Sequence, residues 1–170
     1  MKFSKRGDKG ETSMLGGQRI PKYDPRPDTY GTLDEASSAL GVARAMTENR
    51  KIKEIILDVQ KDLLVMGAEI SSLPEDLDKL TQRIGEVDVT RLEGIIDELQ
   101  KDVELPKVFI YPGESVVSAQ IDVARTIIRR AERKAARLRK EEVINNDEIN
   151  KYLNRLADML FTLARFEEKT

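Results

Sequence analysis

The sequence predicts an all-α protein, a five-helix bundle that follows an N-terminal loop. Three observations lead to this prediction. Five stretches repeat apolar residues at intervals of three and four, glycine and proline separate them, and no stretch alternates long enough to indicate a sheet. The 170 residues amount to one domain. We therefore expect a single domain, 1–170, divided into a loop at 1–28 and a helical bundle at 29–170.

The first half of the chain predicts a loop and two helices. Residues 1–28 contain four glycines and three prolines, which exclude a helix there. Apolar periodicity begins at Thr29 and predicts a first helix that runs to about Glu48. A second helix begins near Lys51 and carries a clear periodic pattern until Pro74 stops it.

The middle of the chain predicts a third helix and a short apolar loop. Asp88 or Thr90 can cap this helix, and Pro106 ends it. The following stretch, 108–113, is apolar and rich in residues that favour strands. Its closing Pro-Gly pair makes it too short for a ladder, so we expect a buried loop.

Two further apolar patterns predict the last two helices. The fourth extends from Ser115 to about Lys140, with Val116 and Val123 among its expected inner residues. The fifth follows a cap at 145–147 and carries an apolar stripe that ends at Phe166.

The amino-acid composition excludes several classes of enzyme mechanism. It has no cysteine and no histidine, which excludes disulfides, thiolate zinc sites, cysteine nucleophiles, and the histidine ligands of a di-iron bundle. What remains is chemistry in which carboxylates, Lys, Arg, hydroxyls and backbone amides act, or in which bound substrates react and the protein positions them. A net charge of −2 argues against a general polyanion binder. No apolar run resembles a signal peptide or a membrane span, so we expect a cytoplasmic protein.

Three groups of residues are candidates for a site. In the loop 4–13, closely spaced glycines with basic and hydroxyl side chains suit a polyphosphate, although a flexible polar N-terminus explains the same residues. Arg125, Arg129 and Glu132 share one helical face and could bind phosphate, or form a solvated charged stripe. Asn154 and Asp158 share a helical face among apolar residues. They could bind a ligand, or they could form helix-capping or inter-helix hydrogen bonds within the bundle. A basic stripe for nucleic acid on the fourth helix is interrupted by glutamates and lacks aromatic residues.

Taken in order, these segments resemble the PduO-type ATP:cob(I)alamin adenosyltransferases. The resemblance spans nearly the whole chain, and many motifs occur in the family's order and spacing. They are residues 6–13, 15–19, Lys22, Arg26, 30–35, 41–44, 109–113, 124–133, 152–158 and 160–161.

The resemblance implies a homotrimer with active sites between subunits and an ordered N-terminal loop that binds ATP. The residues that would hold the triphosphate and its Mg2+ are Ser4, Lys5, Arg6, Gly7, Asp8, Gly10, Thr12 and Lys22. Arg129, Glu132 and Asn154 would complete the nucleotide site, and Glu132 would help to hold Mg2+. Asp34 would pair with Arg125 across the interface. Phe109 would press against the corrin ring and displace its lower ligand, and the catalytic residues would be Arg129, Asn154 and Phe109.

The reaction implied is transfer of the 5'-deoxyadenosyl group of ATP to Co(I) of a corrinoid such as cob(I)alamin, with release of tripolyphosphate. An external reductase would supply Co(I), and an adenosylcobalamin-dependent enzyme would accept the product. Neither nucleic acid nor a membrane is an expected partner. Two alternatives stay open: an ATP- or corrinoid-binding chaperone or sensor without turnover, and a purely structural bundle.

Overall fold

The computed structural model describes residues 5–169, and five α-helices form most of this part of the chain. They are α1 (Pro25–Met46), α2 (Arg50–Ile70), α3 (Glu86–Leu99), α4 (Val116–Lys140) and α5 (Asp147–Glu167). The remaining elements are two 3₁₀ helices, η1 (Arg6–Lys9) and η2 (Pro74–Lys79), and an antiparallel hairpin of β1 (Glu11–Ser13) with β2 (Arg19–Pro21). The predicted all-α bundle is confirmed. None of the helices described is long and apolar enough to cross a membrane.

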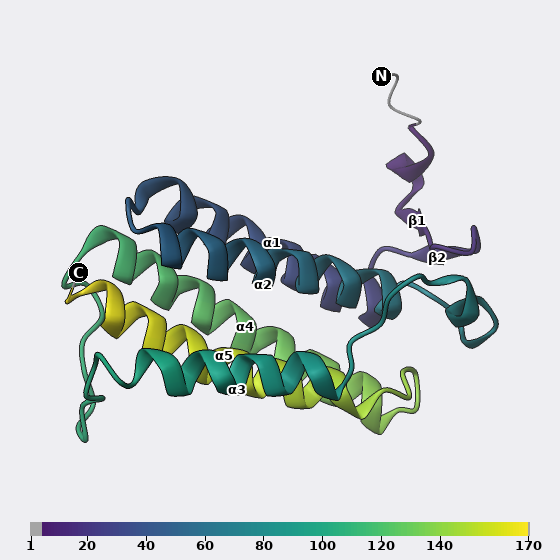
Figure 1. Ribbon diagram of the computed structural model, residues 1–170. Coiled ribbons are helices and arrows are strands. Elements are labelled where there is room, and N and C mark those ends of the chain that lie inside the picture. Colours follow the sequence, from purple (N-terminus) through teal and green to yellow (C-terminus); the bar gives the residue numbers. More distant parts are fainter. Residues whose placement is uncertain (1–4, 170) are drawn as a thin grey trace.

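The helices lie side by side along one long axis (Figure 1). Helix α1 packs against α2 and α4, while α5 packs against α4 and α3. Ion pairs from Lys51 to Glu98 and from Asp62 to Arg91 join α2 to α3. The core between them is made of fully buried side chains from every helix. Its largest members are Tyr152, Leu33, Leu40, Ile52, Ile56, Met66, Ile70, Leu92, Leu99, Ile121, Ile128 and Leu138.

Three of the predicted helix boundaries are wrong: the start of α1, the start of α3, and the end of α3, which lies at Leu99 and not at Pro106. Asp24 caps α1 by accepting a hydrogen bond from the Arg26 amide at 2.9 Å, and Pro25 fits the first helical position, so the exclusion of helix from all of 1–28 was wrong. Neither Asp88 nor Thr90 is the cap of α3. That helix begins after Gly85, whose amide donates to the Asp88 carboxylate at 3.0 Å. The predicted cap of α5 is confirmed at Asn146, and α4 begins directly after Ser115, which caps it.

Buried polar contacts join the ends of several helices where the N-terminal segment meets the bundle. The Arg26 guanidinium donates to the carbonyls of Ser72 at 2.7 Å and Val143 at 2.8 Å. Buried Glu69 accepts hydrogen bonds from Arg83 and from the Asn146 amide group. Because buried groups of this kind need partners, these contacts hold the end of α2 close to the start of α5.

One buried hydrogen bond ties α5 to α2. The Tyr152 hydroxyl donates to the Asp62 carboxylate, which also pairs with Arg91 of α3. Burial raises the pKa of the Tyr152 hydroxyl well above its ordinary value, and the charge of Asp62 and the hydrogen bond to it raise that pKa further. The folded protein therefore favours the neutral phenol.

We expect this hydroxyl to lower stability at alkaline pH. A raised pKa in the folded state stabilises the fold below the unfolded pKa of about 10 and loses that contribution as the pH rises toward the folded pKa. Urea unfolding from about pH 8 to about pH 11 should therefore show a steeper fall for the wild type than for Tyr152→Phe. Parallel curves for the two proteins would contradict the assignment.

Candidate functional site

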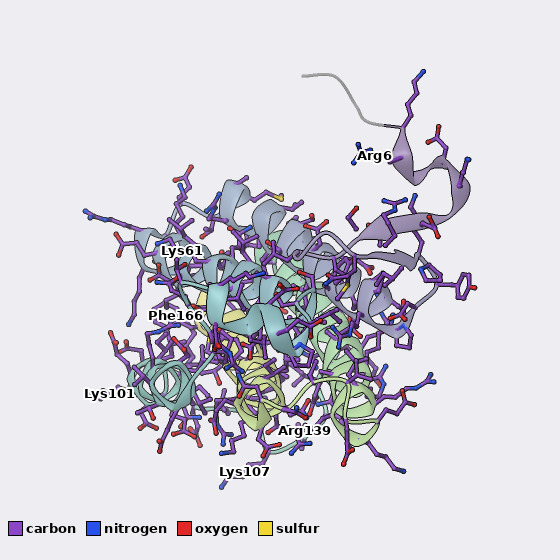
Figure 2. The ribbon with its side chains drawn as sticks, turned by 90° about the vertical axis from the view of Figure 1, so that its right-hand side faces the viewer. Arg6, Lys61, Lys101, Lys107, Arg139 and Phe166 are labelled. Carbon is purple, nitrogen blue, oxygen red and sulfur yellow. The ribbon has the colours of Figure 1, made fainter. Side chains whose placement is uncertain are left out.

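The predicted phosphate-binding residues come together in the N-terminal segment. Arg6, Gly7 and Asp8 form η1, Lys5 precedes it, and Gly10 follows it with φ 78°, a left-handed conformation that glycine adopts at no steric cost. Thr12 lies in β1, directly after this turn. The predicted contribution of Ser4 lies outside the described residues. Figure 2 shows Arg6 in the part of the segment that stands away from the bundle.

This segment is locally positive although the whole chain is slightly negative. Residues 5–22 carry five Lys or Arg and two acidic side chains. The Lys22 side chain lies over the turn, since a Cβ built on Gly7 would be only 3.1 Å from Lys22 Nζ. The Lys22 amide also donates to the Gly10 carbonyl at 2.8 Å. The absence of a side chain at position 7 therefore allows the Lys22 ammonium group to lie directly against the backbone of the turn.

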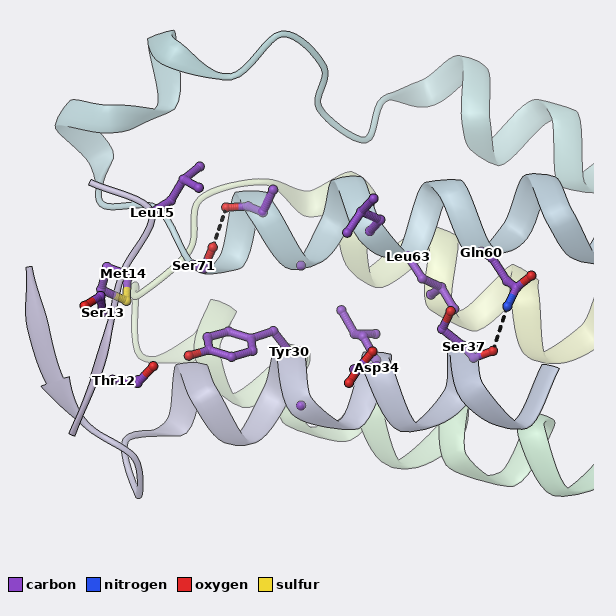
Figure 3. Close-up of a pocket in the computed structure, with 15 residues that line it drawn as sticks. Thr12, Ser13, Met14, Leu15, Tyr30, Asp34, Ser37, Gln60, Leu63 and Ser71 are labelled. Carbon is purple, nitrogen blue, oxygen red and sulfur yellow. Dashed lines mark hydrogen bonds between the residues drawn. The ribbon is translucent and has the colours of Figure 1, made fainter. Parts of the chain in front are cut away.

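A pocket of about 670 Å3 lies between the N-terminal segment, α1 and α2 (Figure 3). Thr12 of β1 and the exposed Asp34 of α1 are among its lining residues. Two of the predicted site residues therefore share this pocket. Asp34 makes no ion pair with another residue of 5–169.

The second predicted group lies on α4 and α5. Asn154 donates a side-chain hydrogen bond to Glu132 at 3.1 Å, so the structure brings these two residues together. Arg129 lies three positions before Glu132 on α4, and its side chain is exposed and makes no hydrogen bond or ion pair within 5–169. Arg129, Asn154 and Asp158 are all exposed, although Asn154 and Asp158 lie among apolar residues in the sequence. Their exposure leaves them accessible to a ligand.

A second pocket, of about 470 Å3, lies among α3, α4 and α5 and is lined by both Arg125 and Arg129. Arg125 Nε donates to Asp122 at 2.7 Å, and the other oxygen of this buried carboxylate accepts from Arg165 at 2.8 Å. Both guanidiniums lie over the Phe161 ring, 5.8 and 5.2 Å from its centroid. Sequence reasoning missed Asp122 and Arg165. The i, i+3 spacing of Asp122 and Arg125 was a signal for the first.

Phe109 lies in the loop between α3 and α4, and the prediction that this loop is buried was wrong. Phe109 and Tyr111 are fully exposed, at 105% and 99%, and Val108 is 74% exposed. Val116 and Val123 of α4, expected on the inner side, are exposed as well, at 66% and 48%. Such exposed apolar side chains commonly mark binding surfaces.

The predicted site residues do not form one cavity within a single chain. The pocket with Thr12 and the pocket with Arg129 share no lining residue. The N-terminal segment and the loop that holds Phe109 lie at opposite ends of the bundle in Figure 1. In Figure 2, Lys107 of that loop again lies on the far side from Arg6. No group of three or more acidic side chains among the described residues could hold a metal ion.

Known proteins with similar sequences cover almost all of the chain. A family model described as "Cobalamin adenosyltransferase" matches residues 2–167. A corrinoid adenosyltransferase of Citrobacter freundii is 42% identical over 99% of this chain and 95% of its own length. One from Bacillus subtilis is 38% identical over 96% of this chain and 84% of its own. The chain spans 49% of the longer PduO protein of Citrobacter freundii, which is 34% identical.

Solved structures agree with the sequence comparison. A variant of the PduO-type ATP:corrinoid adenosyltransferase from Lactobacillus reuteri, complexed with cobalamin and ATP, has a TM-score of 0.89 and 31% identity, covering 98% of this chain and 93% of that one. A second variant of that enzyme, complexed with ATP, has a TM-score of 0.88 at 32% identity, over 98% and 93% of the two chains. The fold and the matched motifs define an ATP-dependent transferase of the PduO type. The chain belongs to the cobalamin adenosyltransferase family.

Proposed function

We propose that this protein transfers the 5'-deoxyadenosyl group of ATP to the Co(I) centre of a corrinoid and releases tripolyphosphate. The observation that carries this proposal is the preformed glycine turn at 6–10, with Lys22 lying over it, in a chain of this family. Backbone amides of a tight turn and nearby ammonium groups bind phosphate well. The relative from Lactobacillus reuteri was solved with cobalamin and ATP, which are the two substrates we assign here.

The N-terminal segment would hold the triphosphate. In this proposal Lys5, Arg6 and Lys22 supply positive charge, while the turn around Gly7 and Gly10 supplies amides. Asp8, Thr12 and Ser4 would complete the contacts to the phosphates and Mg2+. The magnesium ion would arrive bound to ATP, because Mg2+ usually binds substrate phosphates and water together with one or two carboxylates.

Arg129, Glu132 and Asn154 would bind the other side of the nucleotide. Glu132 and Asn154 hold each other at 3.1 Å, which orients the amide and the carboxylate before a ligand binds. Glu132 would also help to hold Mg2+, and the Arg129 guanidinium, which has no partner within residues 5–169, would face the phosphates. Arginine suits this role because its planar donors match phosphate oxygens in two directions.

The chemical step is a displacement at the ribose 5'-carbon. The electron pair of Co(I) forms the cobalt–carbon bond, the bond from C5' to the triphosphate oxygen breaks, and that oxygen leaves with its electrons as tripolyphosphate. No proton has to be removed from the nucleophile, so a chain without histidine or cysteine can promote the reaction. The protein contributes orientation and neutralises the charge that grows on the departing triphosphate.

We place the complete site between copies of the chain in a homotrimer. Thr12 of one half and Arg129 of the other line different pockets of one chain, and we infer that a second copy brings the two halves together. Exposed Asp34 would pair with Arg125 of the neighbouring copy. Arg125 uses Nε for Asp122, which leaves its terminal nitrogens for this contact. Light scattering would test the assembly.

Phe109 would bind the corrin ring from the side of its lower ligand. A fully exposed aromatic ring in an apolar loop suits such a large flat substrate. Displacing the lower ligand would make Co(II) easier to reduce, and an external reductase would supply the electron. The product would pass to an adenosylcobalamin-dependent enzyme. We also propose a cytoplasmic location, which cell fractionation would test.

An anaerobic assay tests the proposed activity. The protein is mixed with MgATP and chemically reduced cobalamin, and both products are measured. We expect a light-sensitive adenosylcobalamin spectrum and an equal amount of tripolyphosphate. Binding of both substrates without either product would instead identify a chaperone or sensor. If calorimetry shows no binding of ATP, the protein is a purely structural bundle.

A further inference from the structure

The hairpin that follows the proposed phosphate turn is fixed firmly to the bundle. The Leu15 amide donates to the Ser71 carbonyl at 2.9 Å, and Met14 is buried. Gly16 lies so close to η2 that a Cβ there would be 1.8 Å from Asp76 Oδ2. Because Asp76 is itself buried, it has little room to move away. The tip of the hairpin therefore has a fixed position.

The phosphate turn itself has few such attachments. The backbone hydrogen bonds within the turn are local, from the Asp8 amide to the Lys5 carbonyl and from the Gly10 amide to the Gly7 carbonyl. Within residues 5–169, two hydrogen bonds reach the turn from outside it. The Lys22 amide donates to the Gly10 carbonyl, and the Arg19 side chain donates to the Arg6 carbonyl. Arg19 lies on β2, opposite Ser13 of β1, and thus on the part of the hairpin that continues from the fixed tip.

One guanidinium reaches three points of the segment. Arg19 donates from NH2 to the Arg6 carbonyl at 2.8 Å and from NH1 to the Ser13 hydroxyl at 3.1 Å. Its NH2 is also 3.6 Å from a carboxylate oxygen of Glu11. The planar arrangement of five N–H donors allows these contacts together, whereas a lysine ammonium on a flexible stem would not keep the same geometry.

We propose that Arg19 is a positioning residue that holds the turn 6–9 in its nucleotide-binding shape before ATP arrives. This inference rests on the proposed function of the turn. Arg19 acts through the Arg6 carbonyl and not through the phosphates. By linking the turn to the fixed hairpin, it lowers the conformational freedom that would otherwise be lost on binding, and a preorganised loop binds more tightly for that reason.

Hydrogen exchange on the full-length protein without ligand tests the first half of this inference. In Arg19→Gln we expect amide exchange across 6–13 to rise roughly tenfold, because a hydrogen bond to a charged donor is lost. The unfolding temperature should stay unchanged, since the turn contributes no buried residue to the core. Arg50→Gln is the matched control, because Arg50 is an exposed arginine that pairs with Glu54 on α2.

Calorimetry with MgATP tests the second half. We expect the dissociation constant of Arg19→Gln to rise roughly 5- to 20-fold, and Arg19→Lys to bind nearly as weakly, while Arg50→Gln binds as the wild type does. Wild-type affinity in Arg19→Lys would mean that charge alone matters, and would overturn the inference, as would unchanged exchange in Arg19→Gln. A wild-type protein that does not bind MgATP would overturn the proposed function instead, and the exchange experiment would still decide whether Arg19 holds the turn.

Discussion

Arg129→Ala should lower kcat roughly 100-fold or more and leave the fold intact. Removing one donor that stabilises charge in a transition state commonly costs this much. In the proposed reaction, negative charge grows on the leaving triphosphate, and Arg129 is the cation on α4 that would face it. The fold should survive because the Arg129 side chain is exposed and makes no hydrogen bond or ion pair within the described residues.

The anaerobic assay and a thermal melt measure the two parts of this prediction. Arg137→Ala is the control, because it also removes an exposed arginine from α4. Arg137 pairs with Glu141, and it lines neither the pocket that contains Thr12 nor the pocket that contains Arg129. We expect the control to keep full activity. If Arg129→Ala unfolds, the residue has a structural role, and if it keeps wild-type turnover, the proposed phosphate contact does not exist.

The helical part of the fold could be predicted where periodicity and capping agree. For α4 and α5, the apolar stripe indicates the helix, and the cap predicted at 145–147 is confirmed at Asn146, while Ser115 caps α4 where the sequence predicted its start. The start of α1 was missed for a physical reason. Proline is compatible with the first turn of a helix, so Asp24 followed by Pro25 indicates a start, although prolines at this density usually indicate a loop.

The short hairpin and the exposed segments were beyond sequence reasoning. Strands of three residues, such as β1, leave no alternation to detect. The apolar stretch 108–113 predicts burial, yet the single chain offers no surface to cover it. Apolar patterns indicate what tends to be covered, but they do not distinguish the chain's own core from a ligand or a second copy.

For the candidate site, the sequence motifs identified residues but not their distances. The resemblance placed Glu132 and Asn154 in one site, and the structure brings them to 3.1 Å. It gave no sign that the buried Asp122 joins Arg125 to Arg165, because Arg165 lies 40 residues after Arg125 within an apolar stretch. Contacts of this kind depend on how α4 packs against α5, which periodicity alone does not determine.

Phe109→Ala should lower the rate of cobalamin adenosylation roughly 10- to 100-fold without changing stability. The Phe109 side chain is fully exposed, so its removal leaves no cavity in the protein. If the ring excludes the lower ligand of the corrinoid, its loss restores that ligand, makes Co(II) harder to reduce and misplaces the cobalt relative to the ribose carbon. Misplacement by about 1 Å can cost about 100-fold in rate.

A spectroscopic measurement separates this role from simple loss of affinity. Co(II) corrinoid bound to the wild type with MgATP should show the spectrum of a centre without its lower ligand, and Phe109→Ala should show the spectrum of a centre that keeps it. Tyr111→Ala is a close control, since Tyr111 is an equally exposed aromatic residue two positions along the same loop. Equal spectra for wild type and Phe109→Ala would show that the ring does not act on the axial ligand. Equal losses in both variants would mean that the loop contributes apolar area in general, with no special place for Phe109.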